Sequence, residues 1–259
     1  MTLATTTSTS RRSSSRGGTP GAGLPGITTL DRAEQVAARL AGLRELVEMA
    51  GRDPDSVTIV AVTKGHGPEV CEAALAAGIT DLGESYAQEL LAKDASGRLS
   101  GARWHFVGGL QARKVRFLAA SVHLWQSLDR LKLVDELARW APGSRVLVQV
   151  RLSEEAGKAG CSLAEVPDLV AEAGRAGLVV EGLMGVGPTA GGPEATRPGF
   201  RRLALLATEL GLGTISMGMS ADVSLALAEG ATMVRVGTSL FGPRPDRAAV
   251  RAWAPQEDD

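Results

Sequence analysis

The sequence is poor in cysteine, and its two cysteines, Cys71 and Cys161, lie far apart along the 259 residues. Neither belongs to a CxxC pair or to a cysteine and histidine cluster, so the sequence indicates neither a disulfide framework nor a zinc site. We interpret both thiols as small buried side chains, which fits a protein of the reducing cytoplasm. No residue is therefore predicted to bind a metal.

Long apolar runs and an excess of either charge are also missing. No uninterrupted apolar stretch reaches the length of a bilayer-spanning helix, so we expect no membrane partner. The formal net charge is −1, which gives no general attraction to polyanions and argues against nucleic acid as a partner. A G-x-G-x-x-G signature opening a helix after the first strand is absent too, which disfavours a dinucleotide-binding fold.

Residues 1–27 differ in composition from the rest of the chain. They are mostly Thr, Ser, Gly and Pro, with Arg11, Arg12, Arg16 and no acidic residue. Such a segment buries too little apolar area to order itself, so we predict a disordered tail over residues 1–27. The same composition fits an organelle transit peptide, to which we give less weight because the tail lacks the apolar residues of an amphipathic helix. The folded domain is predicted over residues 28–247 and a C-terminal tail over residues 248–259.

From Thr29 onward the sequence alternates between helical and extended patterns. A long amphipathic helix comes first, and eight strand candidates follow, each but the last succeeded by a helix. The strands are predicted over residues 57–64, 79–82, 104–107, 122–125, 145–150, 178–183, 214–216 and 233–236. This strict alternation predicts an α/β protein with a single closed (β/α)8 TIM barrel and an extra N-terminal helix, rather than an open sheet. Residues 182–198, rich in Gly and Pro, are predicted to form the longest internal loop.

The first strand ends in Lys64, which is followed by Gly65-His66-Gly67-Pro68. An isolated lysine at a strand end is more often a solvated charge, because long cationic side chains reach readily for water. In a barrel, however, the carboxyl ends of the strands carry the binding and catalytic groups. Lys64 is therefore a candidate reactive amine, whereas we expect His66 to face water.

Small polar residues follow strands seven and eight. Ser216-Met217-Gly218-Met219-Ser220 comes after the seventh strand, and Gly237-Thr238-Ser239 comes after the eighth. Hydroxyls and free N–H groups at the starts of helices suit an anion, and loops seven and eight form the phosphate site of many barrels. Each serine alone would more often be a simple helix cap, but the two loops together favour a phosphate site.

Arg235 is the unusual residue of strand eight, because it lies between Val234 and Val236 in a segment that should be buried. A buried guanidinium needs an acceptor, since an unpaired charge would be costly. It could form a structural salt bridge with a carboxylate such as Glu84 or Glu181, or its N–H groups could face a ligand. A lysine, an anion site and an arginine in this arrangement suit a phosphorylated aldehyde held as a Schiff base, such as pyridoxal 5'-phosphate (PLP).

Several motifs, in order between about residue 30 and residue 244, resemble the YggS/PROSC family of pyridoxal phosphate homeostasis proteins, whose members resemble the N-terminal barrel domain of alanine racemase. The motifs are Ala61-Val62-Thr63-Lys64, Gly83-Glu84-Ser85-Tyr86-Ala87-Gln88-Glu89, Trp104-His105-Phe106-Val107-Gly108-Gly109-Leu110-Gln111, Gln126-Ser127-Leu128-Asp129-Arg130, Gly157-Lys158-Ala159-Gly160, Gly182-Leu183-Met184, Ser216-Met217-Gly218-Met219-Ser220 and Val234-Arg235-Val236-Gly237-Thr238.

The resemblance implies roles for particular residues of this sequence. Lys64 would form the internal aldimine with PLP, and Arg235 would lie at the pyridine nitrogen. The other expected cofactor-binding residues are Ser216, Gly218, Gly237 and Thr238 at the phosphate, together with Ser85 and Met217. Ser85 and Arg113 stand where the family has asparagines, so the polar contacts at the edge of the cofactor differ.

The resulting expectation is a monomeric protein that holds PLP as a reversible lysine aldimine and serves intracellular PLP homeostasis or delivery to apo-enzymes. Lys158 would assist exchange as a second amine, or would be a solvated loop charge.

No catalytic residue is assigned, because the tyrosine-bearing second domain of alanine racemase is missing, and the only tyrosine, Tyr86, is expected to pack under the cofactor ring. A PLP-dependent racemase or decarboxylase is the alternative. A cofactor-free aldolase is disfavoured, because its lysine would be expected on a later strand.

Overall fold

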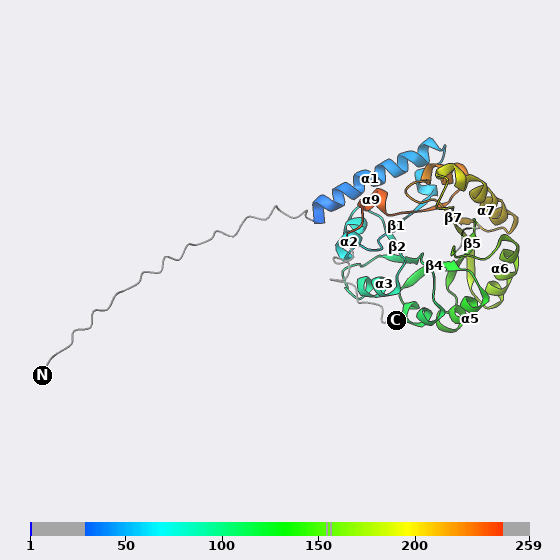
Figure 1. Cartoon of the computed structure of the whole chain (residues 1–259), viewed down its shortest axis with the longest axis horizontal. Helices are drawn as coiled ribbons and strands as arrows, with labels where there is room; N and C mark the ends of the chain where they lie inside the picture. The colour runs from blue at the N-terminus through cyan, green and yellow to red at the C-terminus, as the bar shows by residue number, and fades with distance from the viewer. Residues whose placement is uncertain (2–28, 154, 156, 246–259) are drawn as a thin grey trace.

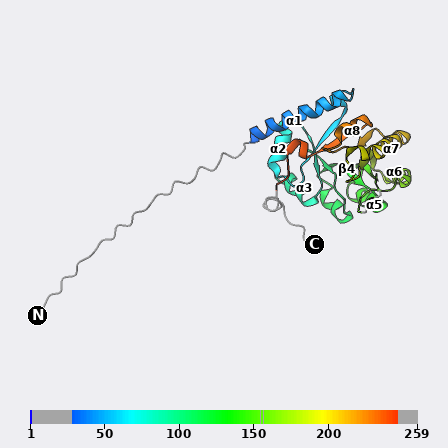
Figure 2. The same ribbon diagram turned by 45° about the horizontal axis from the view of Figure 1, so that its top comes forward.

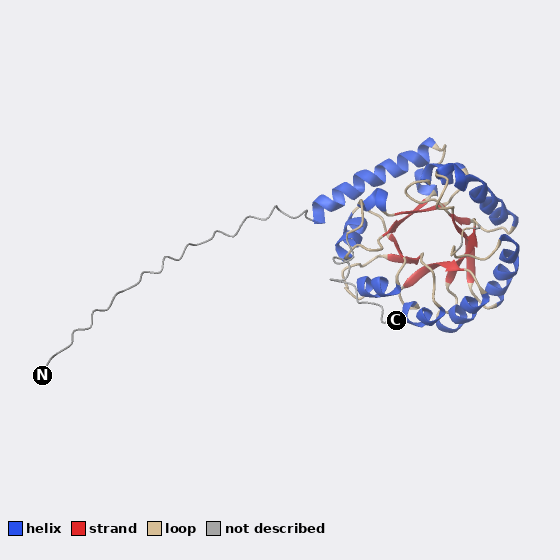
Figure 3. Cartoon of the chain, in the orientation of Figure 1, coloured by secondary structure: helices blue, strands red, loops and turns tan. Residues whose placement is uncertain are grey.

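Eight parallel strands close into a barrel in which each strand pairs with its sequence neighbours and β8 pairs with β1 (Figure 3). The computed structural model describes Met1 and residues 29–153, 155 and 157–245. The strands are β1 Thr58–Val62, β2 Asp81–Glu84, β3 Arg103–Phe106, β4 Val122–Leu128, β5 Arg145–Arg151, β6 Val179–Val186, β7 Thr214–Ser216 and β8 Met233–Val236. The predicted TIM barrel is thus confirmed. The predicted tails lie outside the described residues, apart from Met1.

Helices surround the barrel, and the predicted extra helix α1 packs along its outside against α2 and α9 (Figures 1 and 2). The α-helices are α1 Thr29–Met49, α2 Pro68–Ala76, α3 Ala87–Asp94, α4 Val115–Leu118, α5 Leu131–Trp140, α6 Val166–Arg175, α7 Arg197–Glu209, α8 Val223–Ala228 and α9 Thr238–Phe241. Short 3₁₀ turns lie at Pro54–Ser56, Ala112–Lys114, Leu163–Glu165 and Pro193–Thr196. Among the described helices, none is long and apolar enough to cross a bilayer.

The core has two parts, which follow from the alternation of side chains along the strands. Outward side chains of the strands pack against the helices in one large apolar cluster. Inside the barrel, five apolar side chains fill the lower layer, namely Val60, Leu124, Leu147, Met184 and Met233. The interior also holds buried polar side chains, among them Ser216 and Arg235 of β7 and β8.

The predicted loop over residues 182–198 is wrong over its first part, because β6 continues to Val186. Gly185, which lies beyond the predicted strand end at residue 183, shows why the glycines misled the prediction. A Cβ atom at Gly185 would lie 2.5 Å from Leu152 Cδ1 and 2.9 Å from Leu203 Cδ2, so glycine makes room for these side chains against β6. The sequence after Val186 also contains a 3₁₀ turn, and α7 begins already at Arg197.

Candidate functional site

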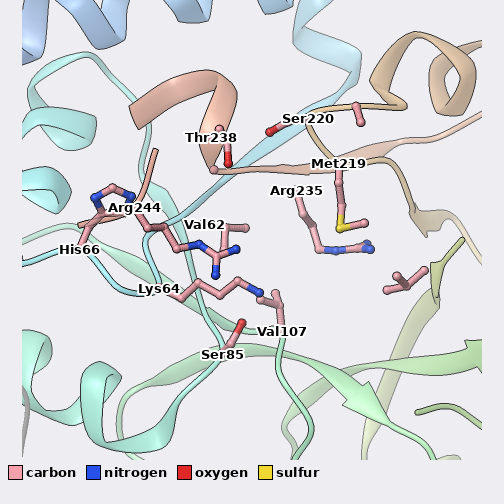
Figure 4. A pocket seen from close by; sticks show the side chains of 13 residues that line it. Val62, Lys64, His66, Ser85, Val107, Met219, Ser220, Arg235, Thr238 and Arg244 are labelled. Carbon is pink, nitrogen blue, oxygen red and sulfur yellow. The ribbon is translucent and has the colours of Figure 1, made fainter. Parts of the chain in front are cut away.

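A cavity of about 380 Å³ opens among the carboxyl ends of the strands (Figure 4). This volume is in the range of pockets for small ligands and cofactors. Its walls come from the ends of β1, β6 and β8 and from the loops after β1, β2, β3, β7 and β8. The lining residues are Val62, Lys64, His66, Ser85, Val107, Val186, Met219, Ser220, Ala221, Arg235, Gly237, Thr238 and Arg244.

Lys64 enters this cavity from the end of β1, and its side chain extends past Ser85 toward Val107 (Figure 4). Partial burial lowers the pKa of the Lys64 amine, and the nearby guanidinium of Arg244 lowers it further. Both effects disfavour the ammonium form. More of the amine is therefore neutral, and thus nucleophilic, at a given pH than in an ordinary lysine.

Arg244 was not expected from the sequence, yet it closes one side of the cavity beside Lys64 (Figure 4). We expect Arg244→Gln to raise the pKa of Lys64, because the substitution removes a nearby positive charge that disfavours the ammonium form. The pH midpoint for acylation of Lys64 by a small activated ester, followed by peptide mass mapping, should therefore move upward. The exposed Arg116, which lies over the ring of Phe117, provides the control Arg116→Gln. An identical midpoint in both variants would show that Arg244 does not act on Lys64.

Arg235 is buried, and it reaches the cavity from β8. Its Nη1 donates to Ser216 Oγ at 2.7 Å and its Nη2 donates to the carbonyl oxygen of Gly185 at 2.9 Å. Burial lowers the pKa of Arg235 to about 10, so the side chain remains charged at neutral pH. The two bonds account for two of its five N–H donors, which leaves donors for an acceptor in the cavity.

The salt bridge considered for Arg235 is wrong, because both carboxylates have other partners. Glu84 pairs with Lys93, and Glu181 pairs with Arg145 near the amino ends of the strands. The two acceptors of Arg235 itself, a hydroxyl and a peptide carbonyl, are neutral. The buried carboxylate of Asp222 acts on Arg235 only through its charge, and neither of the two hydrogen-bond acceptors of the guanidinium is a carboxylate, which favours a ligand as the further acceptor.

A chain of hydrogen bonds inside the barrel supports Arg235 from below. Ser216 Oγ donates to Gln126 Oε1 at 2.7 Å, and Gln126 Nε2 lies 2.8 Å from His105 Nδ1. His105 Nε2 in turn lies 2.9 Å from Asp81 Oδ1. Since the amide N–H of Gln126 can only donate, Nδ1 is the acceptor and the Nε2–H donates to Asp81. The chain fixes the Ser216 hydroxyl as an acceptor for Arg235.

Hydroxyl groups from loops seven and eight form the wall opposite Lys64. Ser220 Oγ accepts the backbone N–H of Ser239 at 3.1 Å and lies 3.0 Å from Ser239 Oγ, which joins the two loops. Thr238 and Gly237 line the cavity beside Ser220. A Cβ atom at Gly237 would lie 3.0 Å from the carbonyl oxygen of Val62, so glycine lets the start of α9 approach β1. This wall offers several donors to one anion.

The structure brings together five of the eight residues expected to bind the cofactor. Lys64, Ser85, Arg235, Gly237 and Thr238 line the cavity. The other three lie behind it and are absent from its lining. The hydroxyl of Ser216 is bonded to Gln126 and Arg235, Met217 is fully buried in the core, and Gly218 makes a turn with a φ of 92°. Ser220, which belongs to the same motif as these three, provides the hydroxyl on the cavity wall.

One further expectation is wrong. His66 does not face water, because its ring is 6% exposed, lines the cavity and packs against Phe241 with 5.7 Å between ring centroids. The left-handed turn at Gly65, with a φ of 76°, directs the loop inward. Tyr86, which was expected to pack under the cofactor ring, is 53% exposed and does not line the cavity.

Lys158, the candidate second amine, also lies outside the cavity lining. Its Nζ donates to the carbonyl oxygen of Gly187 at 3.0 Å and lies 3.3 Å from Glu155 Oε2. Arg113 is exposed, and its Nε donates to Gln111 Oε1. In the part of the chain that the structure describes, no group of three or more His, Cys, Asp and Glu side chains could hold a metal ion.

Known proteins resemble this chain over most of its length. The family described as alanine racemase, N-terminal domain, matches residues 34–245. A pyridoxal phosphate homeostasis protein from Pseudomonas aeruginosa is 41% identical over 220 residues, which cover 82% of this chain and 95% of that protein.

Solved structures agree with this result. PipY of Synechococcus elongatus, solved without PLP, is 34% identical with a TM-score of 0.73, and covers 80% of this chain and 100% of its own. PipY solved with PLP bound is 32% identical over the same shares, with a TM-score of 0.70. The chain therefore belongs to the alanine racemase N-terminal domain family and, within it, to the pyridoxal phosphate homeostasis proteins.

Proposed function

We propose that this chain binds PLP reversibly through Lys64 and takes part in PLP homeostasis as a carrier of the cofactor. The observation that carries the proposal is one cavity that contains an amine of lowered pKa, a buried arginine and a hydroxyl-rich wall. The PLP-bound structure of PipY, a relative at 32% identity, supports the same ligand.

The residues of the cavity match the chemical groups of PLP. The hydroxyls of Ser220 and Thr238, with the backbone at Gly237, would hold the phosphate. Arg235 would donate to the pyridine nitrogen, and Lys64 Nζ is the group for the aldehyde. PLP supplies a carbonyl carbon that a neutral amine attacks with loss of water, and the reverse hydrolysis releases it. Ser216, Met217 and Gly218 would act one layer behind, by holding Arg235 and shaping the loop.

A carrier fits this site better than an enzyme does. An arginine at the pyridine nitrogen disfavours protonation of the ring, which weakens the ring as an electron sink and so limits carbanion chemistry. A racemase also needs a proton-transfer group on each face of the cofactor, whereas Tyr86 lies outside the cavity. A PLP-dependent racemase or decarboxylase remains the weaker candidate. The proposal also includes apo-enzymes as the recipients of PLP, a monomeric state of the protein and a cytoplasmic location.

Reconstitution with PLP tests this function directly. The purified protein should become yellow, and borohydride reduction followed by peptide mapping should place the cofactor on Lys64. Incubation with a panel of amino acids should produce neither loss of chirality nor CO2 at an enzymatic rate. A protein that stays colourless with PLP would refute the binding function, whereas turnover of an amino acid would replace the carrier with an enzyme.

A further inference from the structure

A buried charge cluster lies directly behind Lys64, between β1, β2 and α3. Its centre is Lys93, whose side chain has no exposed surface. Lys93 Nζ lies 2.5 Å from Glu84 Oε1 and 3.6 Å from Glu89 Oε2. No sequence pattern distinguishes Lys93 from the solvated lysines of other helices, and the proposed function assigns it no role.

This cluster bonds to both peptide units that flank Lys64. Lys93 Nζ donates to the carbonyl oxygen of Thr63 at 2.9 Å, which belongs to the peptide unit before Lys64. Glu89 Oε2 accepts the N–H of Gly65 at 2.7 Å, which belongs to the peptide unit after Lys64. Because these two units define the backbone torsions of Lys64, the cluster fixes the direction in which its side chain leaves the backbone.

The loop itself could not provide this rigidity. Lys64 is followed by Gly65 and then, after His66, by Gly67, and glycine is the residue with the greatest backbone freedom. Gly65 also adopts a φ of 76°, in the left-handed region that glycine enters at no steric cost. The Lys64 turn therefore depends on bonds from neighbouring elements for a fixed conformation.

Stability alone gives a poor explanation for such a cluster. Removing two carboxylates and an ammonium from water costs several kcal/mol per ion, and well-packed apolar side chains of similar volume are often equally stable or more so. The cluster bonds to the Lys64 turn rather than only to itself. That placement indicates a role in the geometry of the cavity.

We propose that Lys93 and Glu89 are positioning residues that hold the backbone on both sides of Lys64, so that its amine enters the cavity in one orientation. This role rests on the proposed function, since the orientation matters for the attack of the amine on the aldehyde carbon of PLP. A reacting atom displaced by about 1 Å can lower the efficiency of such a step by on the order of 100-fold.

Four variants separate positioning from general structural support. Lys93→Met removes the donor to Thr63 and keeps an unbranched side chain that is one heavy atom shorter. Glu89→Leu removes the acceptor of the Gly65 N–H, whereas Glu89→Gln keeps an oxygen that can accept it. Asp94→Asn is the matched control on α3, because Asp94 accepts from Trp104 Nε1 and Ser121 Oγ and makes neither of the bonds to the Lys64 turn.

Each variant is titrated with PLP at a temperature where circular dichroism shows it folded, and the adduct is mapped after reduction. Lys93→Met and Glu89→Leu should bind PLP about tenfold more weakly than the wild type. Glu89→Gln and Asp94→Asn should stay within about threefold of it, since neither leaves a flanking peptide unit without its partner. The rate of Lys64 acylation by a small ester, measured without PLP, should be lower in Glu89→Leu than in Glu89→Gln, because both variants remove a negative charge that raises the pKa of Lys64 and only Glu89→Leu also loses the bond to Gly65.

The outcomes are distinguishable. A wild-type protein that forms no adduct on Lys64 would overturn the proposed function. Wild-type PLP affinity in both Lys93→Met and Glu89→Leu, together with equal acylation rates in Glu89→Leu and Glu89→Gln, would overturn the positioning role alone, even if the thermal midpoints are lowered. If Lys93→Met does not fold, the Glu89 pair decides, because equal PLP affinity of Glu89→Leu and Glu89→Gln refutes the role.

Discussion

Replacing Lys64 with alanine should abolish covalent capture of PLP and weaken its retention at least about 100-fold. Among the described residues that line the cavity, Lys64 is the only one with a primary amine, so no neighbour can replace it. Contacts to the phosphate and to the ring nitrogen would remain, and they would leave only weak, reversible binding. Absorbance titration gives the affinity, and borohydride reduction with peptide mapping gives the covalent fraction.

The substitution should not destabilise the fold. The pKa of Lys64 is lowered in the folded protein, chiefly by burial, so the ammonium form is less favourable there than in the unfolded chain. At pH values below the folded pKa this difference lowers stability, and the alanine variant is free of it. We therefore expect its thermal midpoint at neutral pH to equal or exceed that of the wild type.

Lys158→Ala provides the matched control for Lys64→Ala. The amine of Lys158 is bonded to the carbonyl oxygen of Gly187 and pairs with Glu155, outside the lining of the cavity. This variant should capture PLP like the wild type. A mapped adduct that persists in Lys64→Ala, or one that disappears in Lys158→Ala, would assign the aldehyde to a different amine.

The barrel could be predicted because its strands carry a local signal. Eight runs of apolar and β-branched residues alternate with helical segments, and this repeated alternation predicts the closed topology. The end of β6 was missed because glycine has two opposite meanings. At Gly185 it makes room for the side chains of Leu152 and Leu203, whereas in a single sequence it indicates a loop.

Residues of the cavity could be predicted from the sequence only where they lie at, or just after, the end of a strand. Lys64 lies two residues after the end of β1 and Arg235 lies in the last residues of β8, so the topology alone placed them at one end of the barrel. Ser216 was expected at the phosphate, whereas its hydroxyl is bonded to Gln126 and Arg235, and alternation within β7 explains this direction. Ile215 packs into the outer core, so the next side chain, Ser216, points into the barrel toward Arg235.

For other residues of the site, the sequence contains no pattern from which their position could be predicted. Arg244 and His66 reach the cavity through loop conformations, and no periodicity specifies those. Lys93 is spaced like any lysine on an exposed helix face. It becomes buried only because Glu84, from β2, and Glu89, one turn earlier on α3, meet it behind the first strand.

The second large effect is expected from Arg235→Gln, which should weaken PLP binding roughly 10- to 100-fold. A hydrogen bond to a charged partner is worth about 1.5–3 kcal/mol, and about 1.4 kcal/mol corresponds to a tenfold change in affinity. The fold should tolerate the change, because leaving the Gly185 carbonyl without its donor is offset by removing a buried cation that has only neutral acceptors. Absorbance titration with PLP and a thermal unfolding curve measure the two effects separately.

Two further variants show whether the loss of PLP affinity in Arg235→Gln reflects a direct contact with the ligand. Ser216→Ala removes one of the two groups that hold the guanidinium, so its PLP affinity should lie between those of the wild type and Arg235→Gln. Arg145→Gln is the matched control, because Arg145 pairs with Glu181 at the other end of the strands, away from the cavity lining. Unchanged PLP affinity in a folded Arg235→Gln would remove Arg235 from the ligand site and leave it as a structural cation. A loss in Arg145→Gln as large as that in Arg235→Gln would instead trace both effects to the general charge of the barrel.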